Sequence, residues 1–127
     1  MRYVIICIFF LLSNIINAQQ EFAWVYFNDK QNVDYLVNNP ELILSDLSIL
    51  KKQSKGIPID YKDVPINNDY IQIISDLDNL SVLSKSKWFN CVYVEAEIDL
   101  LTSLIDLSFV DSIEFANKSL NPNKNLI

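Results

Sequence analysis

The sequence predicts an α+β domain of the ferredoxin-like class: a split β-α-β with a four-stranded antiparallel sheet, helices on one face and an extra helix. Three observations predict it. Segments 22–27 and 89–94 are rich in β-branched and aromatic residues. Apolar residues recur at helical spacing in other segments. The elements follow the order β, α, α, β, β, α, β, which is the ferredoxin-like order once one helix is set aside as an insertion.

The first strand is expected over residues 22–27, FAWVYF, which are apolar throughout. Side chains alternate along a strand, so two sets of three should face opposite ways: Phe22, Trp24 and Tyr26 on one face, and Ala23, Val25 and Phe27 on the other. Residues 28–30, Asn-Asp-Lys, favour a turn. Residues 31–38 are polar and lack periodicity, so we expect no regular element there.

The first helix is expected to begin at Asn39 as the N-cap residue, with Pro40 at the first helical position. It should end near Lys55, because Gly56, the single glycine of the chain, suits the position just beyond a helix end. Four residues form its apolar stripe: Ile43, Leu44, Leu47 and Leu50.

Two further helices are expected. One covers residues 68–77 after an Asn67 cap. The other covers residues 97–106, with four residues directed inward: Ile98, Leu101, Leu104 and Ile105. Spacing does not identify which helix is the insertion. The remaining strands are expected at 81–86, 88–95 and 109–115.

Two of these strands are apolar on both faces, which predicts a sheet with one face open to a partner. Two helices can cover only one face of a four-stranded sheet. The other face would expose aromatic side chains: Trp24, Tyr26, Phe89 or Tyr93. A large apolar patch on a secreted protein indicates a partner surface. The alternative is that the additional helix covers the second face.

Residues 1–18 have the pattern of a secretory signal peptide. Arg2 supplies a basic start, an apolar run follows, and cleavage is expected after Ala18. We therefore expect a secreted chain with one α+β domain at 19–116 and a flexible C-terminal tail at 117–127. The alternative for the first residues is a buried N-terminal strand or helix.

The composition argues against most kinds of enzyme site. The chain has no histidine, which removes the Ser-His-Asp triad and His-rich metal sites. Once the signal is removed, Cys91 is the only thiol, and its β-forming neighbours predict a core residue. Asp60 and Asp63 could in principle act as an acid pair, but their place beside prolines favours turns and caps. We expect no catalytic residue, no cofactor and no metal.

The charge balance argues against a nucleic-acid partner. The chain has a formal net charge of −6 and no basic patch stands out in its sequence. Neutralising phosphates requires clustered lysine and arginine residues. We therefore expect a protein partner.

The segment at 85–90, Lys-Ser-Lys-Trp-Phe-Asn, leads into a predicted strand. With the strand at 22–27, the proline-containing segment at 56–71 and the closing strand at 108–116, it resembles a known family. That family is the N-terminal pro-region, of the inhibitor type, of secreted bacterial subtilisin-like serine proteases (subtilases). The family has Ser-Lys-Trp-Leu-Asn at this point, and Phe89 stands here in place of the leucine.

The resemblance implies a ferredoxin-like propeptide whose open sheet face docks on the protease and whose tail lies in the substrate cleft. Docking would help the protease fold and would keep it inactive until the tail is cut. Acidic side chains at the sheet edge would meet helix N-termini of the protease. The partner-binding residues implied by position are Trp88, Phe89, Tyr93, Glu95, Asp111, Glu114, Asn117 and Leu120.

The protease's catalytic aspartate, histidine and serine have no counterparts in this sequence, so the resemblance implies a module without activity of its own. We expect a monomer that acts on a subtilisin-like protease, either as a fragment of a longer precursor or as a free-standing inhibitor. No membrane contact is expected after signal cleavage. The alternative function is a secreted structural or adhesion module with no protease partner.

Overall fold

A computed structural model of the chain describes residues 19–122. The expected signal peptide at 1–18 and the end of the expected tail at 123–127 lie outside the described residues. Within 19–122, no helix has both the length and the apolar character needed to cross a membrane.

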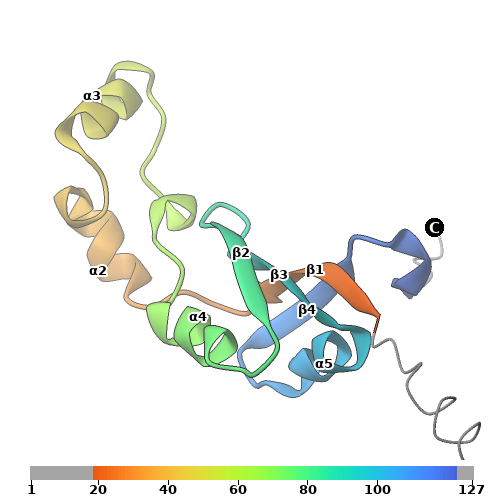
Figure 1. The fold of residues 1–127 in the computed structure, drawn as a ribbon. Helices are drawn as coiled ribbons and strands as arrows, with labels where there is room; N and C mark the ends of the chain where they lie inside the picture. The colour runs from red at the N-terminus through yellow and green to blue at the C-terminus, as the bar shows by residue number, and fades with distance from the viewer. Residues whose placement is uncertain (1–18, 123–127) are drawn as a thin grey trace, which may run out of the picture.

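Four strands form one antiparallel sheet (Figure 1). They are β1 (Gln20–Phe27), β2 (Ser81–Ser86), β3 (Cys91–Glu97) and β4 (Val110–Phe115), in the spatial order β2-β3-β1-β4. Each neighbouring pair is antiparallel. This order places the first and third strands at the centre and confirms the ferredoxin-like class.

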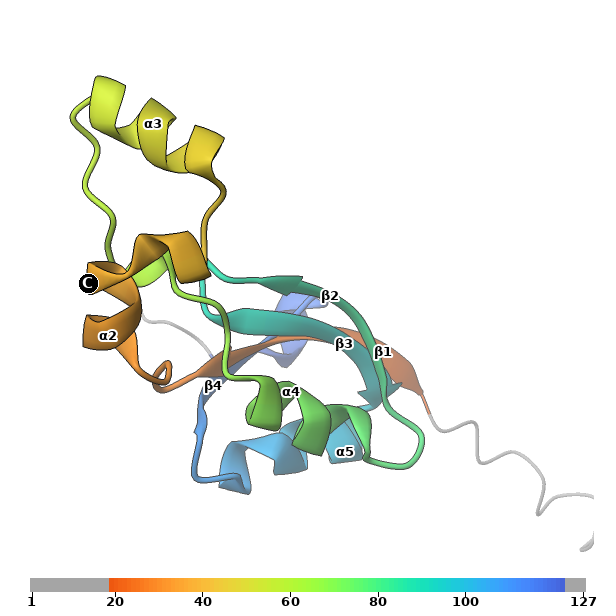
Figure 2. The ribbon, with the colours of Figure 1, turned by 90° about the vertical axis from the view of Figure 1, so that its left-hand side faces the viewer.

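Two helices cover one face of the sheet, as Figure 2 shows: α4 (Asn68–Ser75) and α5 (Ile98–Ser103), the latter continued by the 3-10 turn η4 (Leu104–Asp106). Side chains from this face of the sheet and from the helices form the core. Its members with under 3% exposure are Ala23, Val25, Ile74, Val92, Val94, Ala96, Leu101 and Leu104.

The sequence predicted both covering helices. The Asn67 side chain accepts a hydrogen bond from the Asp69 N–H at 2.9 Å and so caps α4 as expected. The helix predicted at 97–106 is present as α5 and η4, with Leu101 and Leu104 buried. Ile105, expected to face inward, is instead exposed, because the 3-10 turn shifts its direction relative to an α-helix.

An arm of short helices connects β1 to α4. It consists of α2 (Val33–Asn38), the 3-10 turn η2 (Pro40–Leu42), α3 (Asp46–Ser54) and the 3-10 turn η3 (Tyr61–Asp63). The arm is the insertion that the element order required. It lies beyond one end of the sheet (Figures 1 and 2), so the alternative that an extra helix covers the second face is wrong.

Three expectations in and around the arm are wrong. Residues 31–38 are not irregular, because α2 forms there after the left-handed Asn32. The helix expected from Asn39 begins at Asp46, because Ser45 caps it by accepting from the Ser48 N–H, and Pro40 opens only a 3-10 turn. Its end is as predicted: Gly56 has a φ of 63°, which favours glycine.

The third expectation concerns the strand predicted at 88–95. Trp88 and Phe89 lie in the turn between β2 and β3, and β3 begins at Cys91. Asn90, with a φ of 53°, closes this turn in a left-handed conformation that asparagine tolerates. The two aromatic side chains are therefore at the tip of a hairpin and not on the sheet face.

Candidate protein-docking surface

The uncovered face of the sheet carries a cluster of three aromatic side chains. Trp24 on β1 lies opposite Tyr93 on β3, and their ring centroids are 4.6 Å apart. Phe22 stacks on the same tyrosine at 5.9 Å with an interplanar angle of 13°. Phe22 is 37% exposed, and Trp24 and Tyr93 are half-buried. The predicted alternation along β1 is confirmed, because the opposite set, Ala23, Val25 and Phe27, is buried.

Carboxylates border this aromatic cluster. Glu95 lies opposite Phe22 in the β1–β3 register, and Glu114 lies opposite Trp24 in the β1–β4 register. The Tyr26 hydroxyl donates to Glu114 Oε2 at 3.3 Å. Burial, followed by the charge of Glu114, raises the pKa of Tyr26 above its ordinary value. The hydroxyl group therefore stays protonated and can donate this hydrogen bond. The face thus combines an apolar centre with a negatively charged margin.

A cavity of about 630 Å³ adjoins this margin along β4. Tyr26, Asp111 and Glu114 line it from the sheet, and Lys118, Asn121 and Pro122 line it from the chain beyond β4. Asp111 lies at the irregularity in the β1–β4 register, is exposed, and accepts from Ser112 Oγ at 3.1 Å. The cavity therefore separates the sheet from the start of the C-terminal tail.

Chain residues after β4 fold back on the sheet. The 3-10 turn η5 (Lys118–Leu120) is capped by Asn117, whose Oδ1 accepts from the Ser119 N–H at 3.1 Å and from Ser119 Oγ at 2.7 Å. The Asn121 side chain then pairs with the main chain of Phe115. Its Oδ1 accepts from the Phe115 N–H at 2.7 Å and its Nδ2 donates to the Phe115 carbonyl at 3.0 Å.

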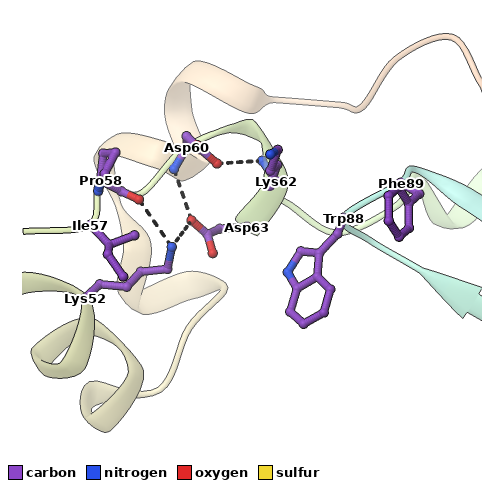
Figure 3. A pocket seen from close by; sticks show the side chains of 8 residues that line it. All are labelled: Lys52, Ile57, Pro58, Asp60, Lys62, Asp63, Trp88 and Phe89. Atoms are coloured by element: carbon purple, nitrogen blue, oxygen red, sulfur yellow. Dashed lines mark hydrogen bonds and ion pairs between the residues drawn. The ribbon is translucent and has the colours of Figure 1, made fainter. Parts of the chain in front are cut away.

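A groove of about 460 Å³ lies at the opposite end of the molecule, between the arm and the β2–β3 hairpin (Figure 3). Trp88 and Phe89 at the hairpin tip are 65% and 70% exposed. Residues of the arm supply the other wall: Lys52, Ile57, Pro58, Asp60, Lys62 and Asp63.

An ion pair fixes the arm side of this groove. Lys52 Nζ lies 3.0 Å from Asp63 Oδ2, and the same oxygen accepts from the Asp60 N–H at 3.1 Å (Figure 3). Burial raises the pKa of Asp63, but the hydrogen bonds from Lys52 and Asp60 and the charges of Lys52 and Lys87 outweigh it, so the pKa is lowered overall. The expectation that Asp60 and Asp63 serve as caps and turns is confirmed, because together they form the capping box of η3.

A buried lysine holds the arm, the hairpin and the end of β1 together. Lys30 is 6% exposed, and its ammonium group donates to the carbonyls of Tyr61 at 2.8 Å, Val64 at 2.6 Å and Lys87 at 2.6 Å. It also lies 4.6 Å from the centre of the Tyr61 ring. Burial and the nearby charge of Lys87 lower its pKa, against the opposing effects of Asp63 and Asp60.

Cys91 has the structural character that its neighbours predicted. It is 1% exposed, and burial raises the pKa of its thiol to about 11. A thiol with so high a pKa is protonated at neutral pH and is a poor nucleophile. Within residues 19–122, no cluster of three or more histidine, cysteine or acidic side chains is arranged to hold a metal ion.

The eight residues predicted to bind a partner fall into three groups. Tyr93, Glu95 and Glu114 lie on or beside the aromatic face, and Asp111 is at its edge. Trp88 and Phe89 are at the far hairpin tip. Asn117 and Leu120 belong to the turn after β4.

Sequence reasoning missed the roles of Lys30 and Asn121. Lys30 directly follows an apolar strand, and the sequence at this position predicts only a turn. Asn121 stands in a stretch rich in asparagine and proline, where nothing distinguishes it from its neighbours. The contacts of Lys30 and Asn121 form only when the chain folds, so no local sequence pattern indicates them.

Comparison with known proteins gives one match. A family model described as the peptidase S8 propeptide domain of Bacteroidota matches residues 22–126. No curated protein and no solved structure matches the chain. The matched range includes the aromatic face, the arm, the hairpin tip and the turn after β4.

Proposed function

Because this chain belongs to the peptidase S8 propeptide domain family of Bacteroidota, we propose that it acts as an intramolecular chaperone and inhibitor of a secreted subtilisin-like serine protease. The family implies a partner of that class. We propose two roles towards this partner: the chain helps the protease to fold and then blocks its substrate cleft. Secretion through a signal peptide cleaved after Ala18 is part of the proposal.

The uncovered aromatic face is the observation that carries the proposal. Phe22, Trp24 and Tyr93 remain accessible although the two central strands bury the residues of their other side, Ala23, Val25, Val92 and Val94. Aromatic residues that are pre-positioned in this way are the usual energetic centres of protein interfaces. A structural module with no partner would gain nothing from leaving this cluster open to water.

The carboxylates around this cluster suit a partner that presents helix ends. Anions are favoured at helix N-termini, where unpaired backbone N–H groups and the helix dipole create positive potential. Once the aromatic face is docked on the protease, helix N-termini of the protease would meet the carboxylates of Glu95, Glu114 and Asp111. Trp88 and Phe89 would add contacts from the hairpin tip, and the tail with Asn117 and Leu120 would enter the substrate cleft.

Inhibition of a purified subtilisin, followed with a chromogenic peptide substrate, tests this docking surface. The double substitution Trp24→Ser and Tyr93→Ser should weaken inhibition about 100-fold or more, because two interface centres are lost. Glu114→Lys, at an exposed position, should weaken inhibition without affecting the fold. The control, Leu47→Ser with Leu50→Ser, also removes two apolar side chains, but these lie on the arm and are 61% and 60% exposed.

Equal inhibition by the wild-type chain and both open-face variants would contradict the proposal. So would an equal loss in the arm control, because the effect would then not be specific to this face. Circular dichroism of each variant separates loss of docking from loss of folding. Deleting residues 117–127 should also weaken inhibition, because the tail would no longer occupy the cleft.

The proposal covers a module of a longer precursor and a free-standing inhibitor alike. The nucleotide sequence beyond codon 127 distinguishes them. An in-frame protease domain there indicates a precursor, whereas a stop codon followed by an unrelated gene indicates a separate inhibitor.

A further inference from the structure

The free edge of β4 is closed by the chain's own tail. β4 is an edge strand, and the Ala116 N–H donates inward to the Phe22 carbonyl at 2.8 Å. Since main-chain groups point alternately to the two sides of a strand, those of Phe115 point to the free edge. There Asn121 satisfies both of them, at 2.7 and 3.0 Å.

We propose that this Asn121–Phe115 clasp is a latch that withholds the tail from the protease cleft in the free module. The inference rests on the proposed function and adds a regulatory contact to it. The side-chain amide of Asn121 offers a donor and an acceptor to one residue, as a neighbouring strand would. The two hydrogen bonds are partly buried, which protects them from competition by water.

The latched and cleft-bound arrangements exclude each other on geometric grounds. A tail that lies in a substrate cleft as a strand must be extended, and six extended residues span about 20 Å. In the clasp, the chain reverses within residues 115–121, so that the side chain of the last contacts the backbone of the first. Asn117, which caps the intervening 3-10 turn, stabilises this reversal.

The clasp should therefore lower the fraction of molecules that are ready to insert the tail. Apparent affinity falls in proportion to the fraction in the competent state. Two hydrogen bonds of ordinary net strength correspond to roughly a tenfold bias towards the closed state. Opening the clasp by mutation should raise the association rate with a protease by about the same factor.

Two variants open the latch from different sides. Asn121→Ala removes both hydrogen bonds to Phe115, and Asn117→Ala removes the cap of the turn while Asn121 is kept. Lys55→Gln is the control, since this exposed lysine of the arm lies outside the tail and the aromatic face, and its side chain makes no hydrogen bond within the described part of the chain. Hydrogen exchange of the Phe115 amide, followed by NMR, reports the clasp in the absence of any protease.

We expect exchange at Phe115 to accelerate about tenfold in both alanine variants and association with subtilisin to accelerate with it, while Lys55→Gln matches wild type. Unchanged exchange in Asn121→Ala would overturn the clasp. Faster exchange with an unchanged or slower association rate in both alanine variants would overturn its role as a latch. If wild type itself fails to inhibit, the proposed function fails, and the exchange data still decide whether the clasp exists.

Discussion

At the scale of single residues, Lys30 shows how a buried charge can be structural. Its ammonium group has three donors, and the three carbonyl oxygens around it accept all of them. The acceptors come from η3, from the segment after η3 and from the hairpin. One side chain therefore joins three segments of the chain to the end of β1, and Asn90 of the hairpin adds hydrogen bonds to Phe27, Asp29 and Tyr61.

Lys30→Met should destabilise the fold by about 2–4 kcal/mol, because it leaves three buried or partly buried carbonyls without a donor. Urea unfolding followed by tryptophan fluorescence measures the change. Lys62→Met is the control, because Lys62 is exposed and should alter stability by less than about 0.5 kcal/mol. Equal effects of the two substitutions would show that the cage around Lys30 contributes nothing specific.

At the scale of elements, the arm differs from the two helices that cover the sheet. α4 and α5 each contribute buried residues to the core, whereas α2, η2 and α3 contribute none. The apolar side chains of α3 include Leu47 and Leu50, which are 61% and 60% exposed. The arm is held to the domain by polar contacts, chiefly those of Lys30 and Asn90 with Tyr61 of η3, and the ion pair between Lys52 and Asp63 links α3 to η3 within the arm.

Leu47→Ser combined with Leu50→Ser should therefore change the stability of the free domain by no more than about 1 kcal/mol. Leu101→Ala in α5 should cost about 2–5 kcal/mol, because this leucine is fully buried and its loss leaves a cavity. Thermal or urea unfolding compares the two directly. A loss of similar size in the arm variant would place the arm within the cooperative folding unit.

At the scale of the whole molecule, the sheet is stabilised from one side only. The core lies between the sheet and the pair α4 and α5, and the aromatic cluster of the other face stays accessible. A domain of this size buries a smaller fraction of its surface than larger domains do. A partner that covers the open face would therefore bury the aromatic cluster and pack the second side of the sheet.

Binding should raise the melting temperature of the module markedly. A protease present at 100 times its dissociation constant adds about 2.7 kcal/mol, which for a domain near this size corresponds to roughly 10–20 °C. Calorimetry with an active-site-blocked subtilisin measures the shift. The Trp24→Ser, Tyr93→Ser variant should show almost none, and an equal shift for that variant would argue against docking through this face.

Local patterns in the sequence were sufficient for the covering helices and for the orientation of β1. The cap of α4 at Asn67 and the alternation of Trp24 with Val25 depend on residues within one turn or one strand, and both predictions are confirmed. The order of the elements was enough for the sheet topology, because few arrangements satisfy it. These two facts together favoured an aromatic cluster on an open face, and the position of the arm beyond one end of the sheet excluded the alternative of a covering helix.

Sequence patterns alone predicted the fold class, the helices near 68–77 and 97–106 and the alternation along β1, but they left open whether the extra helix covers the second face of the sheet. The hairpin turn, the burial of Lys30 and the clasp of Asn121 depend on contacts between segments that are distant in the sequence, so only the folded chain reveals them. The turn at Trp88 and Phe89 is closed by Asn90, whose side chain donates to the carbonyls of Phe27 and Asp29. The burial of Lys30 and the clasp of Asn121 likewise depend on which carbonyls and amides the folded chain brings within reach.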